Sequence, residues 1–266
     1  MGTKSTSTAL STALLVSIFL AAGCAAPDQA AGGGVIAGPV AEITSDAALC
    51  QGNEVPLKAL KNPKPATELG PEALPALGGR DVEQFHAESW LIAQESSNKV
   101  MLMNKLAVPQ DDGAGDIRDY VYVIISTNSM ASEPGKPVWA VVEASACTPT
   151  LDLGELKAGT VTLDPSANPA PENDSVALLV TEAACNSGQN AAGRIEVVKK
   201  VETEATVELV IGVRRSGDQL SSCQSNPPTP FTVHLDRPLG DRAILDAAVV
   251  PSRDIPAPSR PGTPAR

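Results

Sequence analysis

The sequence has few aromatic residues and almost no histidine. Of its 266 residues, 3% are aromatic and two are histidine, His86 and His234. It contains no G-x-S-x-G, H-E-x-x-H or P-loop motif, and no S-x-x-K motif with matching partners. Hydrolytic chemistry would therefore need an unusual general base, because histidine is the side chain that most often fills that role. We expect neither catalytic residues nor a bound metal or cofactor.

Long apolar runs are also missing, apart from one near the N-terminus. Residues 9–22 are mostly apolar and follow Lys4, but the run is shorter than the about 20 residues that span a membrane. It closes with Leu-Ala-Ala-Gly-Cys24, which resembles the lipobox of bacterial lipoproteins, although Ala21 is less typical there than leucine. The resemblance implies a signal peptide over 1–23 and lipidation of Cys24 on the extracytoplasmic face of the cell membrane. An ordinary secretory signal cleaved near the same place is the alternative.

Basic residues are outnumbered by acidic ones. Lys and Arg total 20 against 31 Asp and Glu, for a formal net charge of −11 at pH 7. Nucleic-acid partners are disfavoured, because phosphate backbones require clustered Lys and Arg. The partners we expect are the membrane, through the lipid on Cys24, and an unidentified envelope protein or small ligand.

The five cysteines show no C-x-x-C spacing, which argues against zinc and thioredoxin-like sites. Lipidation would occupy the thiol of Cys24 and leave four cysteines in an oxidising compartment. An even number of free thiols there favours two disulfides. Three pairings are formally open. We favour Cys50–Cys147 and Cys185–Cys223, because each then lies within one predicted domain.

Composition divides the mature chain into four segments. Residues 24–43 are small and nearly uncharged, as in a flexible tether. We expect a small α+β domain at 44–155, with short helices and an antiparallel sheet, and an antiparallel β-sandwich-like domain at 156–250. Residues 251–266, with five prolines and three arginines, are predicted to be disordered.

Strand patterns dominate from Trp90 onward. The longest apolar β-branched run is 119–126, and further strands are predicted at 90–95, 99–104, 138–147, 159–163, 175–181, 195–201, 206–213 and 231–236. Before Trp90 the prolines leave only short helical candidates, the best at 81–88, which carries His86. Most aromatics fall between residues 85 and 139, where they form either one core or an exposed sugar-stacking platform.

Two polar features have competing interpretations. The loop 110–116 presents three aspartates around two glycines, which suits either a solvated hairpin loop or a calcium site outside the EF-hand pattern. His234 alternates outward on its predicted strand beside Thr232 and Asp236. With no second histidine near it in sequence, it is not expected to bind a metal.

The C-terminal third contains Val180-Thr-Glu-Ala-Ala-Cys-Asn-Ser-Gly188, Asn226-Pro-Pro-Thr-Pro230 and Pro238-Leu-Gly-Asp-Arg242. These segments resemble an uncharacterised family of secreted and lipid-anchored proteins of high-GC Gram-positive bacteria, which implies a location and an architecture but no activity. Glu182, Arg194 and Arg242 lie next to apolar strands and should pair if they are buried. They form either a structural lock between strand ends or a site at which Arg194 and Arg242 hold a small anion.

The function that these observations favour is a lipid-anchored, non-catalytic binding or structural module of the cell envelope. The competing class is an envelope hydrolase that works through carboxylates such as Glu143 or Asp241. A deep cleft with two facing carboxylates would favour the hydrolase.

Overall fold

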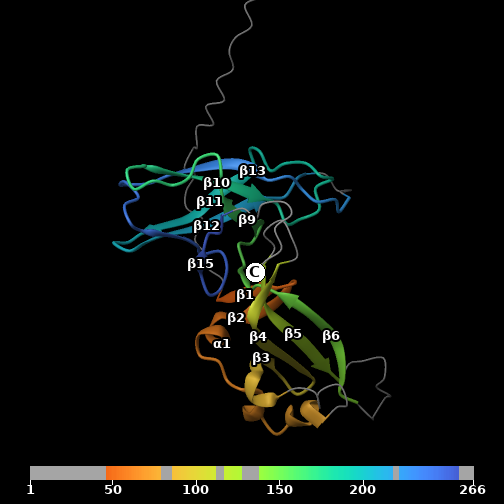
Figure 1. The fold of residues 1–266 in the computed structure, drawn as a ribbon. Coiled ribbons are helices and arrows are strands. Elements are labelled where there is room, and N and C mark those ends of the chain that lie inside the picture. The colour runs from red at the N-terminus through yellow and green to blue at the C-terminus, as the bar shows by residue number, and fades with distance from the viewer. Residues whose placement is uncertain (1–45, 79–85, 112–116, 128–137, 218–221, 258–266) are drawn as a thin grey trace, which may run out of the picture. The chain divides into compact units, whose positions relative to one another are not determined.

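The computed structural model describes residues 46–78, 86–111, 117–127, 138–217 and 222–257 (Figure 1). All described residues belong to one compact unit of the chain. The predicted signal peptide, the tether and Cys24 lie outside the described residues, as do most of the predicted 81–88 helix and the loop 112–116. No helix in the described part of the chain is long and apolar enough to cross a membrane.

The protein is mostly β, with several antiparallel sheets. Its first sheet has the order β2-β1-β7, from β1 (Ala47–Cys50), β2 (Asn53–Pro56) and β7 (Thr150–Leu151). The sequence predicted only short helices before Trp90, so the β1–β2 hairpin is a correction. Gln51 and Gly52 connect its strands with φ of 52° and 84°. Two positive φ values match a type I′ turn, in which the glycine was the available sequence signal.

The helical segments are all short, as the prolines predicted. They are α1 (Leu57–Lys61) and the 3-10 turns η1 (Ala66–Glu68), η2 (Leu74–Gly78) and η3 (Ala87–Ser89). Of the described elements, η3 overlaps the end of the predicted helix at 81–88, of which residues 81–85 lie outside the described residues. There His86 precedes the turn with its side chain exposed to solvent.

The longest apolar run forms β5 (Ile117–Ser126), inside a four-stranded antiparallel sheet. The sheet has the order β3-β4-β5-β6, with β3 (Leu91–Glu95), β4 (Lys99–Asp111) and β6 (Ala140–Cys147). Val123 and Ile125 enter one buried cluster, and Tyr120, Tyr122 and Ile124 enter another. Burial of alternate residues in separate clusters explains why the run is continuously apolar. Trp90, Tyr120 and Tyr122 are buried, which contradicts the sugar-stacking platform for these three aromatics.

The remaining strands surround a further buried cluster, separate from the two just described. They are β8 (Leu156–Ala158), β9 (Thr160–Leu163), β10 (Ser175–Thr181), β11 (Ile195–Glu202), β12 (Thr206–Arg214), β13 (Thr229–His234), β14 (Ala243–Asp246) and β15 (Arg253–Asp254). One sheet has the order β13-β10-β9, and the other has β11-β12-β14-β15 with β8 also on β12. Alternate residues of β10 and β12 enter the same cluster, among them Leu178, Leu209 and Ile211. The predicted 195–213 hairpin and the outward direction of His234 are both confirmed.

The segment after Pro251 differs from its prediction. Arg253 and Asp254 pair with β14, Ile255 is buried in the core, and the Leu163 N–H donates to the Pro256 carbonyl at 2.9 Å. Strand pairing, the buried Ile255 and this hydrogen bond hold the stretch in place, although the average composition of 251–266 favoured disorder. Residues 258–266 lie outside the described residues.

Both cysteine pairs are those expected from the sequence. Cys50 pairs with Cys147 and Cys185 with Cys223, with Cα–Cα distances of 5.5 and 4.4 Å. The first joins β1 to the end of β6, and the second joins the segments that follow β10 and precede β13. Two disulfides favour an oxidising, extracytoplasmic environment for the folded chain.

Candidate functional site

Arg194 and Glu182 form a bidentate ion pair at the end of β10. The Arg194 nitrogens donate to the two Glu182 oxygens at 2.9 and 2.6 Å, and also to the carbonyls of Arg214 and Asn190. The Glu182 side chain is only 3% exposed. The hydrogen bond to Glu182 raises the pKa of Arg194. For these two residues the arrangement matches the structural lock, one of the two interpretations of the charges next to the apolar strands.

Arg242 has a different partner, Glu202 at the end of β11. Its Nη1 donates to Glu202 Oε2 at 2.7 Å, and its other nitrogens donate to the carbonyls of Leu239, Arg237 and Pro238. Lys200 Nζ lies 2.8 Å from the second Glu202 oxygen. Arg194 and Arg242 therefore bind separate carboxylates, and we do not propose an anion site at these two arginines.

The charge state of Glu202 follows from these contacts. Burial disfavours its ionised form, but hydrogen bonds from Lys200, Arg242 and the Asp236 N–H outweigh burial and lower the pKa of Glu202 to about 2. The sequence missed Glu202 because its partner lies 40 residues away. A carboxylate after the Lys199-Lys200 pair, at a hairpin end, was the only local signal.

The two carboxylates of the hydrolase hypothesis lie on separate elements. Glu143 is on β6, where it accepts hydrogen bonds from the Tyr122 hydroxyl and from Asn53 Nδ2. Burial and then the contact with Glu143 raise the pKa of Tyr122 to about 12, so this hydroxyl stays protonated at neutral pH. Asp241 is exposed in the turn before β14. Within the described ranges, no three His, Cys, Asp or Glu side chains gather as a metal site.

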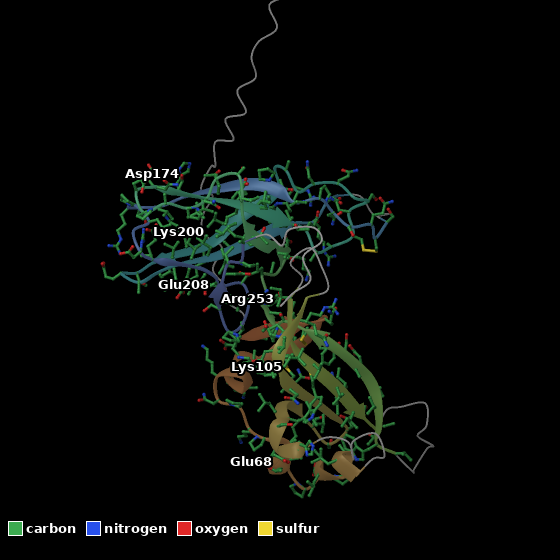
Figure 2. All side chains as sticks on the ribbon, in the orientation of Figure 1. Glu68, Lys105, Asp174, Lys200, Glu208 and Arg253 are labelled. Carbon is green, nitrogen blue, oxygen red and sulfur yellow. A yellow bond between two sulfur atoms is a disulfide. The ribbon has the colours of Figure 1, made fainter. Side chains whose placement is uncertain are left out.

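One cleft of about 610 Å³ brings together residues that are far apart in the sequence. Its charged lining residues are Lys61 at the end of α1, Lys105 on β4, Lys199 on β11 and Glu208 on β12. Figure 2 labels Lys105 and Glu208 on their strands. The apolar lining consists of Leu57, Leu60, Leu151, Val201, Val210, Ala247, Val249, Val250 and Pro251. Tyr120 and Ser252 complete it.

Lysines exceed carboxylates around this cleft, against the acidic balance of the whole chain. Lys61, Lys105 and Lys199 are exposed, and no salt bridge involves them in the part of the chain that the structure describes. Each lysine carries a flexible apolar stem, which can lie along the aliphatic lining while its ammonium group stays in water. The site thus combines an apolar floor with a positive rim.

The segments beside the cleft are joined by backbone hydrogen bonds and one ion pair. Leu151 N–H donates to the Ala248 carbonyl at 2.7 Å, and Val250 N–H donates to the Pro149 carbonyl at 2.8 Å. Arg253 Nη1 lies 3.0 Å from Asp119 Oδ2, which also accepts from the Thr148 hydroxyl. These contacts fix the 247–252 lining against β7.

No local sequence pattern predicted this site. Its three lysines come from segments centred about residues 61, 105 and 199, with no shared motif. Comparisons with protein-family models, with curated proteins and with solved structures found no match.

Proposed function

We propose that the protein is a lipid-anchored, extracytoplasmic binding module of the cell envelope that works without catalysis. The lipobox-like Leu20–Cys24 and the resemblance of the C-terminal third to secreted and lipid-anchored proteins support the location. The two disulfides support an oxidising compartment. The cleft is the place where we expect the ligand to bind.

The architecture that we propose for this module has two parts. An α+β domain at 44–155 is supported by the separate clusters around Trp90 and Tyr122. A β-sandwich-like domain at 156–250 is supported by the cluster that joins β10, β12 and β13. Such a division would place the cleft lining on segments from both domains, which is a common position for ligand sites.

The observation that carries a binding function is the lining of the cleft. A volume of about 610 Å³ falls within the about 300–1,000 Å³ of small-molecule sites, which are mostly apolar with few polar groups. Glu208 is the only carboxylate among the described residues that line it, and neither Glu143 nor Asp241 is one of them. General acid–base hydrolysis by paired carboxylates needs a second such group within reach of the substrate.

The location is tested with the full-length chain and its Cys24→Ser variant. We expect wild-type protein in the membrane fraction, with lipid on Cys24, and the variant in the medium or as an uncleaved precursor. Mass spectrometry of the mature N-terminus is the readout. An unmodified N-terminus in membrane-associated wild-type protein would overturn the lipid anchor.

The binding function is tested with an envelope extract. Native mass spectrometry of the Cys24→Ser chain after incubation should show a compound retained with unchanged mass. Consumption of an extract component by the wild-type chain, with loss of that turnover in Glu143→Gln or Asp241→Asn, would instead establish the hydrolase. Retention of nothing would refute the binding function.

A further inference from the structure

The charge and the apolar character of the cleft together restrict what it can bind. We infer that the ligand is a single-chain amphiphile, an acyl or alkyl chain that carries an anionic phosphate or carboxylate head. This inference rests on the proposed binding function and names the chemistry of its ligand. It follows from the lining residues, from their charge and from three lysines that form no salt bridge with any described residue.

The apolar lining requires an apolar part in the ligand. Nine of the lining residues are aliphatic or proline side chains, drawn from α1, β7, β11, β12 and the 247–251 segment. A fully polar ligand would cover this surface without gaining from it. Each methylene that leaves water for such a surface raises affinity about fourfold. Binding should therefore strengthen steeply with chain length.

The rim requires a negative charge on the ligand. Lys61, Lys105 and Lys199 line the cleft from three separate elements, and Glu208 is the one carboxylate among the described lining residues. Arg253, which follows the lining residue Ser252, is paired with Asp119. Lysine ammonium groups act as point charges on flexible stems, so they can bind a phosphate or a carboxylate in more than one geometry. Cationic and neutral heads would leave these lysines uncompensated.

Larger anionic partners fit these residues less well. Nucleic acid needs many phosphate contacts, and the chain carries an overall charge of −11. An acidic peptide would use the lysines but leave the aliphatic floor without a matching chain. A single-chain amphiphile matches both parts of the lining.

The test uses the Cys24→Ser full-length chain and dodecyl phosphate below its micellar concentration. Isothermal titration calorimetry should show saturable binding at one site. Octyl phosphate should bind at least tenfold more weakly, as four fewer methylenes are buried. Dodecyl maltoside, with the same chain and a neutral head, and inorganic phosphate, with no chain, should each bind at least tenfold more weakly. The affinity for dodecanoate, which has a carboxylate head on a similar chain, is compared with that for dodecyl phosphate.

Charge-matched variants connect binding to the cleft. Lys61→Gln/Lys199→Gln removes two exposed lysines of the rim and should weaken dodecyl phosphate binding at least tenfold. Lys58→Gln/Lys64→Gln removes two exposed lysines that do not line this cleft and should change the affinity less than twofold. Raising the salt concentration should weaken binding to the wild type more than to the rim variant.

The outcomes separate this inference from the proposed function. Equal affinity for dodecyl maltoside and dodecyl phosphate would overturn the anionic amphiphile while leaving a binding module intact. Equal losses of dodecyl phosphate affinity in the two double variants would do the same. Rim-dependent binding of an acidic peptide in place of dodecyl phosphate would do the same. If no alkyl ligand binds and the envelope extract leaves no retained compound, both the inference and the proposed function fail.

Discussion

Removing the carboxylate of Glu202 should destabilise the protein far more than removing a neighbouring surface carboxylate. The Glu202 and Arg242 side chains are 7% and 4% exposed, and their atoms lie 2.7 Å apart. Glu202→Gln would leave the Arg242 charge buried with only carbonyl and amide acceptors. Breaking a buried pair in this way typically costs about 3–5 kcal/mol. The three carbonyls that Arg242 retains place the expected loss near the lower end, at about 3 kcal/mol.

The matched control lies two residues away. Glu204 pairs with Arg237, but these side chains are 92% and 44% exposed. An exposed pair of this kind contributes about 0–1 kcal/mol, so Glu204→Gln should leave stability almost unchanged. The assay is urea unfolding followed by circular dichroism, with both disulfides intact and all variants measured at pH 7. A loss below about 1 kcal/mol for Glu202→Gln, the range of an exposed pair, would refute the argument.

The pH dependence gives a second check on the same residue. Because the folded protein lowers the pKa of Glu202 to about 2 from 4.5, its ionised form contributes stability above pH 4.5. That contribution is lost as the pH falls from 4.5 through 2. The difference between wild type and Glu202→Gln should therefore be constant near neutrality and shrink in acid. A difference that does not change with pH would contradict the assigned charge state.

Two further predictions concern the disulfides and Asp246. In the chain-entropy model, a loop of 38 residues predicts that Cys185→Ser/Cys223→Ser lowers the free energy of unfolding by about 4 kcal/mol. The loop of 97 residues predicts a loss of about 5 kcal/mol for Cys50→Ser/Cys147→Ser. Free thiols found by non-reducing peptide mapping of the wild type would contradict both. Burial raises the pKa of Asp246 to about 6, although the hydrogen bond from the Ala248 N–H and the charge of Arg253 both lower it. Because the fold favours the protonated form, stability should fall as the pH rises from 3.8 through 6, by up to about 3 kcal/mol. Asp246→Asn should flatten this dependence in urea midpoints measured against pH; an unchanged slope would exclude Asp246 as its source.

Local periodicity predicted most of the strands. β5, β10 and the β11–β12 hairpin were expected at nearly the observed positions, because their apolar patterns are long and match a buried strand. The β1–β2 hairpin was missed, since four-residue strands carry too little pattern to outweigh the surrounding prolines. The ordered contact of Ile255 was missed because one apolar residue barely changes the composition of a proline-rich tail.

The candidate site was much less predictable than the fold. Glu182 and Arg194 are 12 residues apart at neighbouring strand ends, and their pairing was expected. Arg242 was placed with Arg194 only in the alternative of an anion site. It pairs instead with Glu202, because β14 runs parallel to β12 and brings this region to the end of the β11–β12 hairpin. The direction and register of a strand depend on contacts distant in sequence, which local patterns do not contain.

By itself, the sequence determined the β character of the chain, its main strands and the expected pairing of its cysteines. Those features depend on residues that are close together, or on an even number of thiols divided between two segments. Only the tertiary structure decided that Lys61, Lys105 and Lys199 would line one cleft and that Arg242 would be taken by Glu202. The physical reason is that a site made from distant segments exists only after the chain has paid the entropy of bringing them together.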